Sequence, residues 1–200
     1  MDERQPPSIA ETVGGPLGLI ESAVPAVAFV VAYTITESTE TSAGVAVGLV
    51  VILAIARLVR RESPTASLAG LVGVAFSAFI ATRSGRAEDF FLPGLLANAA
   101  YAAAFVVSIA VRWPLLGVMI SAVRGGDMAW RKDPKAVRAY SRASWVWVAL
   151  FSLRLAVQLP LYLASALTAL GVARIAMGIP LFAVGIWLSW LILRPREAAV

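Results

Sequence analysis

Ala143–Leu163 reads ASWVWVALFSLRLAVQLPLYL, and this stretch decides the fold. It is apolar over the length of about 20 residues that an α-helix needs to cross the hydrocarbon core of a bilayer. One residue near its middle, Arg154, is charged, and a charge at the centre of a membrane helix costs about 2.5–3.5 kcal/mol on insertion scales. The folded protein must therefore provide a partner for this side chain.

Further apolar stretches of similar length occupy most of the chain. Together with Ala143–Leu163 they predict an all-α bundle of six transmembrane helices. Trp113–Val123 is also apolar but too short to cross. The other five predicted spans are Leu17–Thr36, Ser42–Val59, Ala66–Thr82, Gly94–Val111 and Gly171–Leu193.

The composition agrees with a membrane protein. Hydrophobic residues make up 60% and charged residues 14% of the 200 residues, whereas soluble domains are about 45–50% apolar and about 25% charged. We expect one transmembrane domain at 17–194 between a cytoplasmic segment at 1–16 and a cytoplasmic tail at 195–200.

The distribution of Lys and Arg predicts the orientation. With the N-terminus inside, 13 of the 17 Lys and Arg residues fall on the cytoplasmic side, as the positive-inside rule requires. Both termini are therefore predicted to be cytoplasmic. The long connection 112–142 between the fourth and fifth spans is predicted to be an amphipathic cytoplasmic loop.

The connection 112–142 is the largest predicted segment outside the membrane. Trp113-Pro114 should end the preceding helix. Trp113–Val123 is expected either to lie along the cytoplasmic interface or to dip into the membrane. Asp133-Pro134 has the pattern of a helix start, with Asp as the N-cap. The basic residues that follow are predicted to bind anionic lipid or a soluble partner; the candidates are Arg131, Lys132, Lys135, Arg138 and Arg142.

Polar residues inside the predicted spans form a second candidate site. Arg154 and Gln158 are one turn apart, so they share a helix face, which steps of three and four residues extend to Trp147, Phe151 and Tyr162. Asn98 and Tyr101 lie on Gly94–Val111, and Glu21 lies near the inner end of Leu17–Thr36.

Two interpretations of these residues stay open. Arg154 can bind a carboxylate or phosphate through two parallel hydrogen bonds, which would suit a small transporter or channel for an anionic or polar solute. Alternatively, it pairs with Glu21 or donates to backbone carbonyls that Pro25, Pro160 or Pro180 leave without a helical partner.

Small residues predict close helix packing. Gly44 and Gly48 are four residues apart, and Gly70, Gly73 and Ser77 follow on the next predicted span. Such spacing lets helix backbones approach. We expect these residues to pack within the bundle, with a dimer interface as the alternative.

The residue types limit the chemistry. The chain contains neither Cys nor His, which excludes thiol catalysis and thiolate or imidazole metal sites. Glu88 and Asp89 could bind a divalent ion, but the adjacent Arg83 and Arg86 favour a salt-bridged turn. We therefore expect no enzyme activity, no cofactor and no metal.

Three segments carry a resemblance to a known family: RWPLLG from Arg112, AYSRASWVWVALF from Ala139 and ALGVARIAMGIPL from Ala169. Over residues 17–194 the chain resembles an actinobacterial integral-membrane family labelled a domain of unknown function. Its second half is more distantly similar to the intracellular septation protein A family, a resemblance that implies a role in the envelope or in division. Neither resemblance supplies a catalytic residue.

These observations favour a non-enzymatic accessory or scaffold protein, multi-pass in the bacterial cytoplasmic membrane. Its expected partners are anionic membrane lipids and either another membrane protein or a second copy of the chain, and no nucleic acid. The small transporter or channel remains the alternative.

Overall fold

The computed structural model describes the backbone of residues 15–60, 64–123, 125–126 and 128–194 and, within these ranges, the side chains outside 15–22 and 64–67. The predicted cytoplasmic segment 1–16, apart from Gly15 and Pro16, and the tail 195–200 lie outside the described residues. So does the side chain of Glu21.

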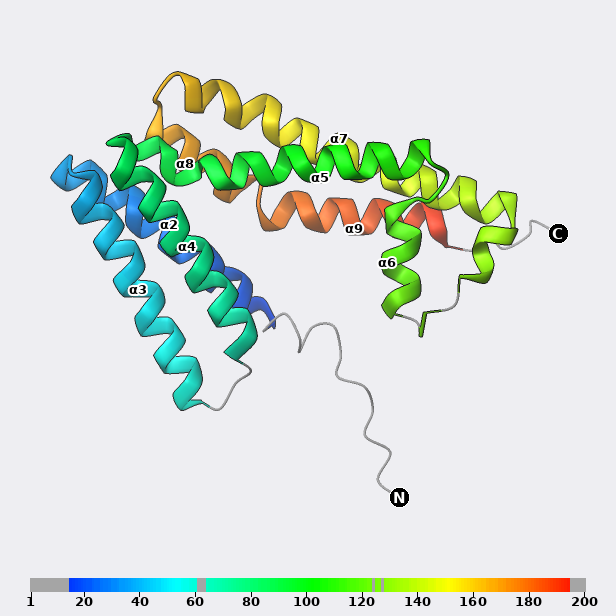
Figure 1. Cartoon of the computed structure of the whole chain (residues 1–200), viewed down its shortest axis with the longest axis horizontal. Coiled ribbons are helices and arrows are strands. Elements are labelled where there is room, and N and C mark those ends of the chain that lie inside the picture. Colours follow the sequence, from blue (N-terminus) through cyan, green and yellow to red (C-terminus); the bar gives the residue numbers. More distant parts are fainter. Residues whose placement is uncertain (1–14, 61–63, 124, 127, 195–200) are drawn as a thin grey trace. The chain divides into compact units, whose positions relative to one another are not determined.

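All regular secondary structure in the described residues is helical, as predicted (Figure 1). In chain order the elements are α2 (Gly15–Thr36), α3 (Thr39–Val59), α4 (Pro64–Ser84), the 3₁₀ turn η1 (Ala87–Phe91), α5 (Leu92–Ala110), α6 (Leu115–Val123), the 3₁₀ turn η2 (Ala129–Lys132), α7 (Pro134–Leu163), α8 (Leu167–Ala176) and α9 (Ile179–Leu193).

Four helical segments among the described residues are long and apolar enough to cross a membrane: Thr39–Val59, Ala87–Ala110, Pro134–Leu163 and Leu167–Leu193. The described apolar parts of α2 and α4, Ala23–Thr36 and Leu68–Ser84, are shorter. By length and composition, the chain is therefore a membrane protein.

Contacts between residues divide the chain into two compact units. Unit 1 comprises Met1–Pro93 and Leu161–Val172, and unit 2 comprises Gly94–Pro160 and Ala173–Val200. Each unit is described by itself below.

Unit 1 is built on the neighbouring helices α2, α3 and α4 (Figure 1). Small residues such as Ala43, Ala46 and Ala81 fill the contacts between them, which allows the backbones to lie close together. Phe29 is fully buried and stacks on Phe90 with 4.0 Å between ring centroids. The aromatic pair therefore joins α2 to η1.

An aromatic cluster forms the core of unit 2. Phe151 of α7 contacts Phe105 of α5 and Phe182 of α9, with ring centroids 6.0 Å and 6.1 Å apart. Trp147 contacts the same rings and donates a hydrogen bond from Nε1 to Ser189 Oγ over 3.0 Å. The face of α7 that carries Arg154 is thus packed against α5 and α9.

The predicted helix boundaries around the long connection are confirmed. α5 ends at Ala110, and Arg112 then adopts a left-handed φ of 56° before the predicted break at Trp113-Pro114. α6 covers Leu115–Val123. α7 begins at Pro134, where Asp133 Oδ1 accepts a hydrogen bond from the Lys135 backbone N–H over 2.8 Å, as expected of an N-cap.

The last predicted span, Gly171–Leu193, was expected to be one helix, but the structure divides it between two. α8 ends at Ala176 and α9 begins at Ile179, so Met177 and Gly178 separate two helices. Pro180 explains the break, because it has no N–H to donate to the preceding turn and is suited to the first turn of a new helix. The apolar character continues through the break, and for this reason hydropathy alone did not detect it.

The expected packing role of the glycines is also wrong within unit 1. Gly44 and Gly48 are exposed, and among the described residues no atom beyond their chain neighbours and the adjacent backbone of their own helix, α3, lies within 4 Å of the Cβ position of either glycine. The same holds for Gly70 and Gly73. On α3, Ala43 and Ala46 make the buried contact instead.

Candidate functional site

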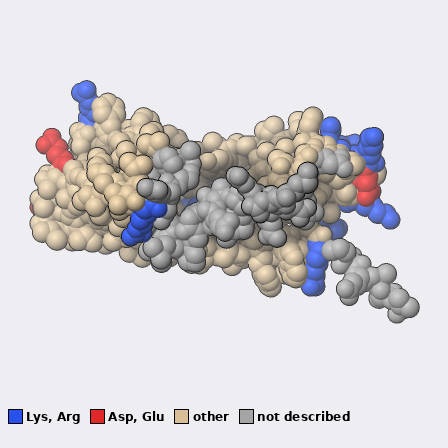
Figure 2. Space-filling model, turned by 90° about the horizontal axis from the view of Figure 1, so that it is seen from below, with Lys and Arg blue, Asp and Glu red and all other residues tan. Residues whose placement is uncertain are grey.

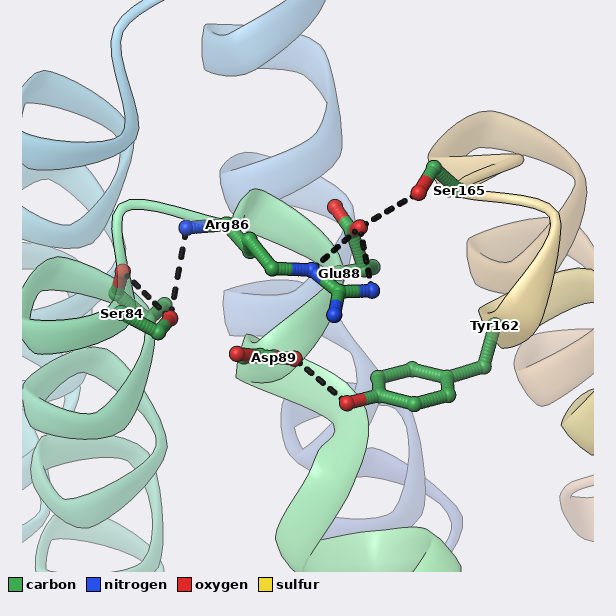
Figure 3. A network of polar contacts seen from close by, with 7 residues as sticks. Ser84, Arg86, Glu88, Asp89, Tyr162 and Ser165 are labelled. Atoms are coloured by element: carbon green, nitrogen blue, oxygen red, sulfur yellow. Dashed lines mark hydrogen bonds and ion pairs between the residues drawn. The ribbon is translucent and has the colours of Figure 1, made fainter.

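Two adjacent carboxylates are buried in unit 1. Glu88 and Asp89 lie in η1 and are only 7% and 6% exposed. Arg86 Nε donates to Glu88 Oε1 over 3.0 Å, and the Arg86 side chain forms an ion pair with the same oxygen at 2.9 Å (Figure 3). This hydrogen bond, and then the charge of Glu88, raise the pKa of Arg86 above its ordinary value. The salt-bridged turn expected from the sequence is confirmed for this pair.

The end of α7 and the turn after it complete the network in unit 1. Tyr162 donates its hydroxyl proton to Asp89 Oδ1 over 2.6 Å, and Ser165 Oγ donates to Glu88 Oε1 over 2.6 Å (Figure 3). Arg86 also lies over the Tyr162 ring, 5.5 Å from its centroid. The network therefore joins η1 to the end of α7 and the turn after it, which are far apart in sequence.

This arrangement fits a structural role better than a metal site. Hydrogen bonds to charged groups contribute about 1.5–3 kcal/mol each, and each carboxylate has a hydroxyl donor. No group of three acidic side chains that could hold a metal ion occurs among the described residues. The sequence does not indicate that Tyr162 and Ser165 bond to these carboxylates, because their partners are 73 and 77 residues away.

Arg154 in unit 2 meets the break between α8 and α9. Its Nε donates to the Met177 backbone carbonyl over 2.8 Å, and its guanidinium lies over the Phe182 ring, 5.1 Å from the centroid. Met177 occupies the break, where helical partners are missing. Of the two interpretations offered by the sequence, this contact matches donation to a carbonyl freed near Pro180.

Gln158 lies one helical turn after Arg154 and is only 3% exposed. Its Nε2 is enclosed and has no hydrogen-bond partner among the described residues. A buried amide without a partner costs about 1–3 kcal/mol. The stability of unit 2 therefore gives no reason for a polar side chain at position 158.

The other predicted residues of the intramembrane site are placed differently. Asn98 is buried on α5, whereas Tyr101 is 54% exposed and its ring contacts Phe151. Within the described part of the chain, no hydrogen bond joins either residue to Arg154 or Gln158. Tyr162, which shares the α7 periodicity, belongs to the network of unit 1.

The basic side chains after α6 form an exposed surface of unit 2. Figure 2 shows Lys and Arg gathered at this end of the unit, on the right of the view. Lys135, Arg138 and Arg142 recur at three- and four-residue steps on α7 and therefore share one face. We call this the basic surface; its members are Arg131, Lys132, Lys135, Arg138 and Arg142, and all are exposed.

Aromatic contacts hold the basic surface against α6. Arg131 lies over the Trp113 ring, 3.8 Å from its centroid. Trp130 donates from Nε1 to Ser121 Oγ over 2.6 Å and packs edge-on against Tyr140. Gly117 makes this packing possible, because a Cβ there would lie 2.9 Å from the Trp130 ring. The connection is thus folded onto α6 rather than extended.

Residues 13–200 match the model of a family described as "Protein of unknown function (DUF3159)", and the chain belongs to this family. No curated protein matches the chain, and no solved structure matches it. The family description assigns no substrate, partner or reaction.

Proposed function

We propose that this chain is a non-enzymatic accessory or scaffold protein of the bacterial cytoplasmic membrane, and that it works through its basic surface. The proposed topology has six spans, with α8 and α9 together forming the last, and places both termini in the cytoplasm. The distribution of Lys and Arg supports this orientation.

The observation that carries the proposal is the ordered form of the basic surface. Asp133 caps α7, so Lys135, Arg138 and Arg142 project from a helix and not from a random chain. The stacking of Arg131 on Trp113 adds a further charge at a set position. An anionic lipid surface attracts each such residue by about 1 kcal/mol.

The apolar surface beside these charges supports a lipid partner. Met119 and Val123 on α6 are 52% and 66% exposed, and Trp113 is 43% exposed. A short apolar helix flanked by Lys, Arg and Trp suits the interface between headgroups and acyl chains, where basic and tryptophan side chains are enriched. In this position α6 buries its exposed apolar side chains while the basic surface meets the headgroups.

Binding of anionic lipid can be measured on the purified protein in phosphatidylcholine nanodiscs that contain fluorescent phosphatidylglycerol. We expect energy transfer from tryptophan to the labelled lipid in the wild type. The double variant Lys135→Gln/Arg138→Gln should weaken this enrichment by about 30-fold, the equivalent of about 2 kcal/mol. High salt should also weaken the lipid enrichment, because it screens the attraction between the basic side chains and the headgroups.

A matched control removes the same charge elsewhere. Arg60→Gln/Arg83→Gln neutralises two exposed arginines outside the basic surface, and we expect a much smaller change in lipid enrichment. Equal losses in the two double variants would mean that total charge, and not the basic surface, attracts the lipid.

The scaffold role is tested by crosslinking in membranes followed by affinity purification. A scaffold that uses the basic surface should retain specific membrane-protein partners and lose them in the triple variant Lys135→Ser/Arg138→Ser/Arg142→Ser. If the same partners remain in this variant, the basic surface has no part in the assembly.

A further inference from the structure

We propose that the break between α8 and α9 in unit 2 is a binding site for an oxyanion, a carboxylate or phosphate group, with Arg154 as the charged partner and Gln158 as a second donor. This site goes beyond the proposed scaffold role, which depends on the basic surface.

The charge of Arg154 is the first reason. Arg154 Nε donates to the Met177 carbonyl, and the guanidinium lies over the Phe182 ring. Both groups are neutral, so they orient the guanidinium without cancelling its charge. A guanidinium has five N–H donors arranged as a fork that matches two oxygens of a carboxylate or phosphate.

Gln158 is the second, independent reason. It is almost fully buried, and its Nε2 lacks a partner in the described part of the protein. Residues four apart on a helix have Cβ atoms about 5–6 Å apart, so one small anion can reach both Arg154 and Gln158. An anion there would receive hydrogen bonds from a charged and a neutral donor.

The start of α9 adds a third favourable group. Its N-cap is Gly178, which provides no side-chain hydrogen bond. The first N–H groups of a helix have no helical acceptor, and they favour negative charge. Because Arg154 already contacts Met177, the residue before this cap, the guanidinium and the start of α9 lie at the same break.

The test uses the whole protein in nanodiscs of phosphatidylcholine, which has no net charge. The probes are inorganic phosphate and hexanoate as free anions, and phosphatidic acid and oleate as lipid-borne anions. Isothermal titration and the shift of the thermal unfolding midpoint report binding. Saturable binding of the free anions would identify a soluble ligand, and binding of the lipid-borne anions alone would identify a ligand that enters from the bilayer; either result supports the site.

Variants at Gln158 separate the site from folding. Gln158→Leu removes the unpaired donor and should fold, while affinity for the probes falls by at least about tenfold, the value of one hydrogen bond to a charged group. Gln158→Glu places a carboxylate one turn from Arg154, which should neutralise the arginine and abolish binding. Arg154→Lys keeps the charge but loses the fork, so it should bind phosphate and hexanoate more weakly than the wild type.

Two controls complete the test. Ser189→Ala removes another buried polar side chain of unit 2 and should leave the affinity unchanged. Lys135→Gln/Arg138→Gln should also bind the anions like the wild type. The proposed role of the basic surface and the proposed anion site can therefore be disproved separately. The proposal is overturned if no probe binds the wild type at millimolar concentration, or if Gln158→Leu binds with wild-type affinity.

Discussion

The buried carboxylates of unit 1 and the Arg154–Gln158 pair of unit 2 differ in their hydrogen bonding. In unit 1, the carboxylates of Glu88 and Asp89 receive hydrogen bonds from Ser165 and Tyr162 at 2.6 Å. In unit 2, Arg154 donates to a neutral carbonyl, and Gln158 Nε2 has no partner among the described residues. In the first arrangement each carboxylate has a hydroxyl donor, whereas in the second the amide nitrogen of Gln158 has no acceptor among the described residues.

This difference distinguishes buried polar groups that stabilise the fold from buried polar groups that destabilise it. Matched groups stabilise the folded state, because removing one partner leaves the other buried and unsatisfied. An unmatched buried group costs free energy and needs another explanation. Substitutions in unit 1 and at Gln158 should therefore change stability in opposite directions.

The largest effect is expected for Glu88→Ala. We expect the free energy of unfolding to fall by about 3 kcal/mol, because the bond from Ser165 to a charged oxygen is lost and a cavity remains. Arg86 is half-exposed and adds little. Unfolding in mixed detergent micelles measures the change. Glu40→Ala, at an exposed residue, is the control, and a similar loss there would contradict a specific role for the network.

Tyr162→Phe should be next, with a loss of about 2 kcal/mol, because Asp89 stays buried without its hydroxyl donor. The same unfolding experiment measures it. Tyr101→Phe removes a hydroxyl from a side chain that is 54% exposed and should change stability very little. If the two variants behave alike, the Tyr162–Asp89 hydrogen bond does not stabilise unit 1.

Ser189→Ala tests a matched group inside unit 2. Its hydroxyl donates to the Gly185 carbonyl over 2.7 Å and accepts from Trp147 Nε1. We expect a loss of about 1.5 kcal/mol, because the indole N–H of Trp147 loses its acceptor. Tryptophan fluorescence should report the same change locally. An unchanged stability would show that water or lipid replaces the hydroxyl.

Gln158→Leu should have the smallest effect and the opposite sign. Replacing an unpaired buried amide by an apolar side chain of similar size removes a desolvation cost, so we expect the ligand-free protein to gain about 1 kcal/mol. A clear loss of stability would mean that Gln158 makes a hydrogen bond that holds unit 2 together, and the contrast between the units would then disappear.

The sequence predicted the helices well where local rules act. Trp113-Pro114 and Asp133-Pro134 mark boundaries through proline geometry and capping, which depend only on neighbouring residues. It failed at Met177 and Gly178, because hydropathy does not register a break inside an apolar stretch. The packing predicted for the glycines of α3 was wrong for a related reason. The spacing shows that one helix face carries small residues, but it does not show which face is buried.

The sequence predicted the contacts of some candidate site residues better than those of others. Arg154 could be identified from the sequence because it is a charged residue within an apolar span. The suggested donation to a carbonyl near Pro180 agrees with the contact to Met177. Tyr162 was assigned to the same face as Arg154, yet it bonds to Asp89. Contacts between residues more than 70 positions apart depend on tertiary packing, which no local pattern in a single sequence reveals.

The contact between Arg154 and Met177 has a consequence for biogenesis. The acceptor lies 23 residues downstream of the arginine, and ribosomes add about 5–20 residues per second, so Arg154 emerges about 1–5 s before its acceptor has been made. During this interval α7 carries an uncompensated charge and partitions poorly into lipid. We therefore expect α7 to remain beside the translocon until α8 and α9 arrive, and the three helices to enter the bilayer as one insertion unit.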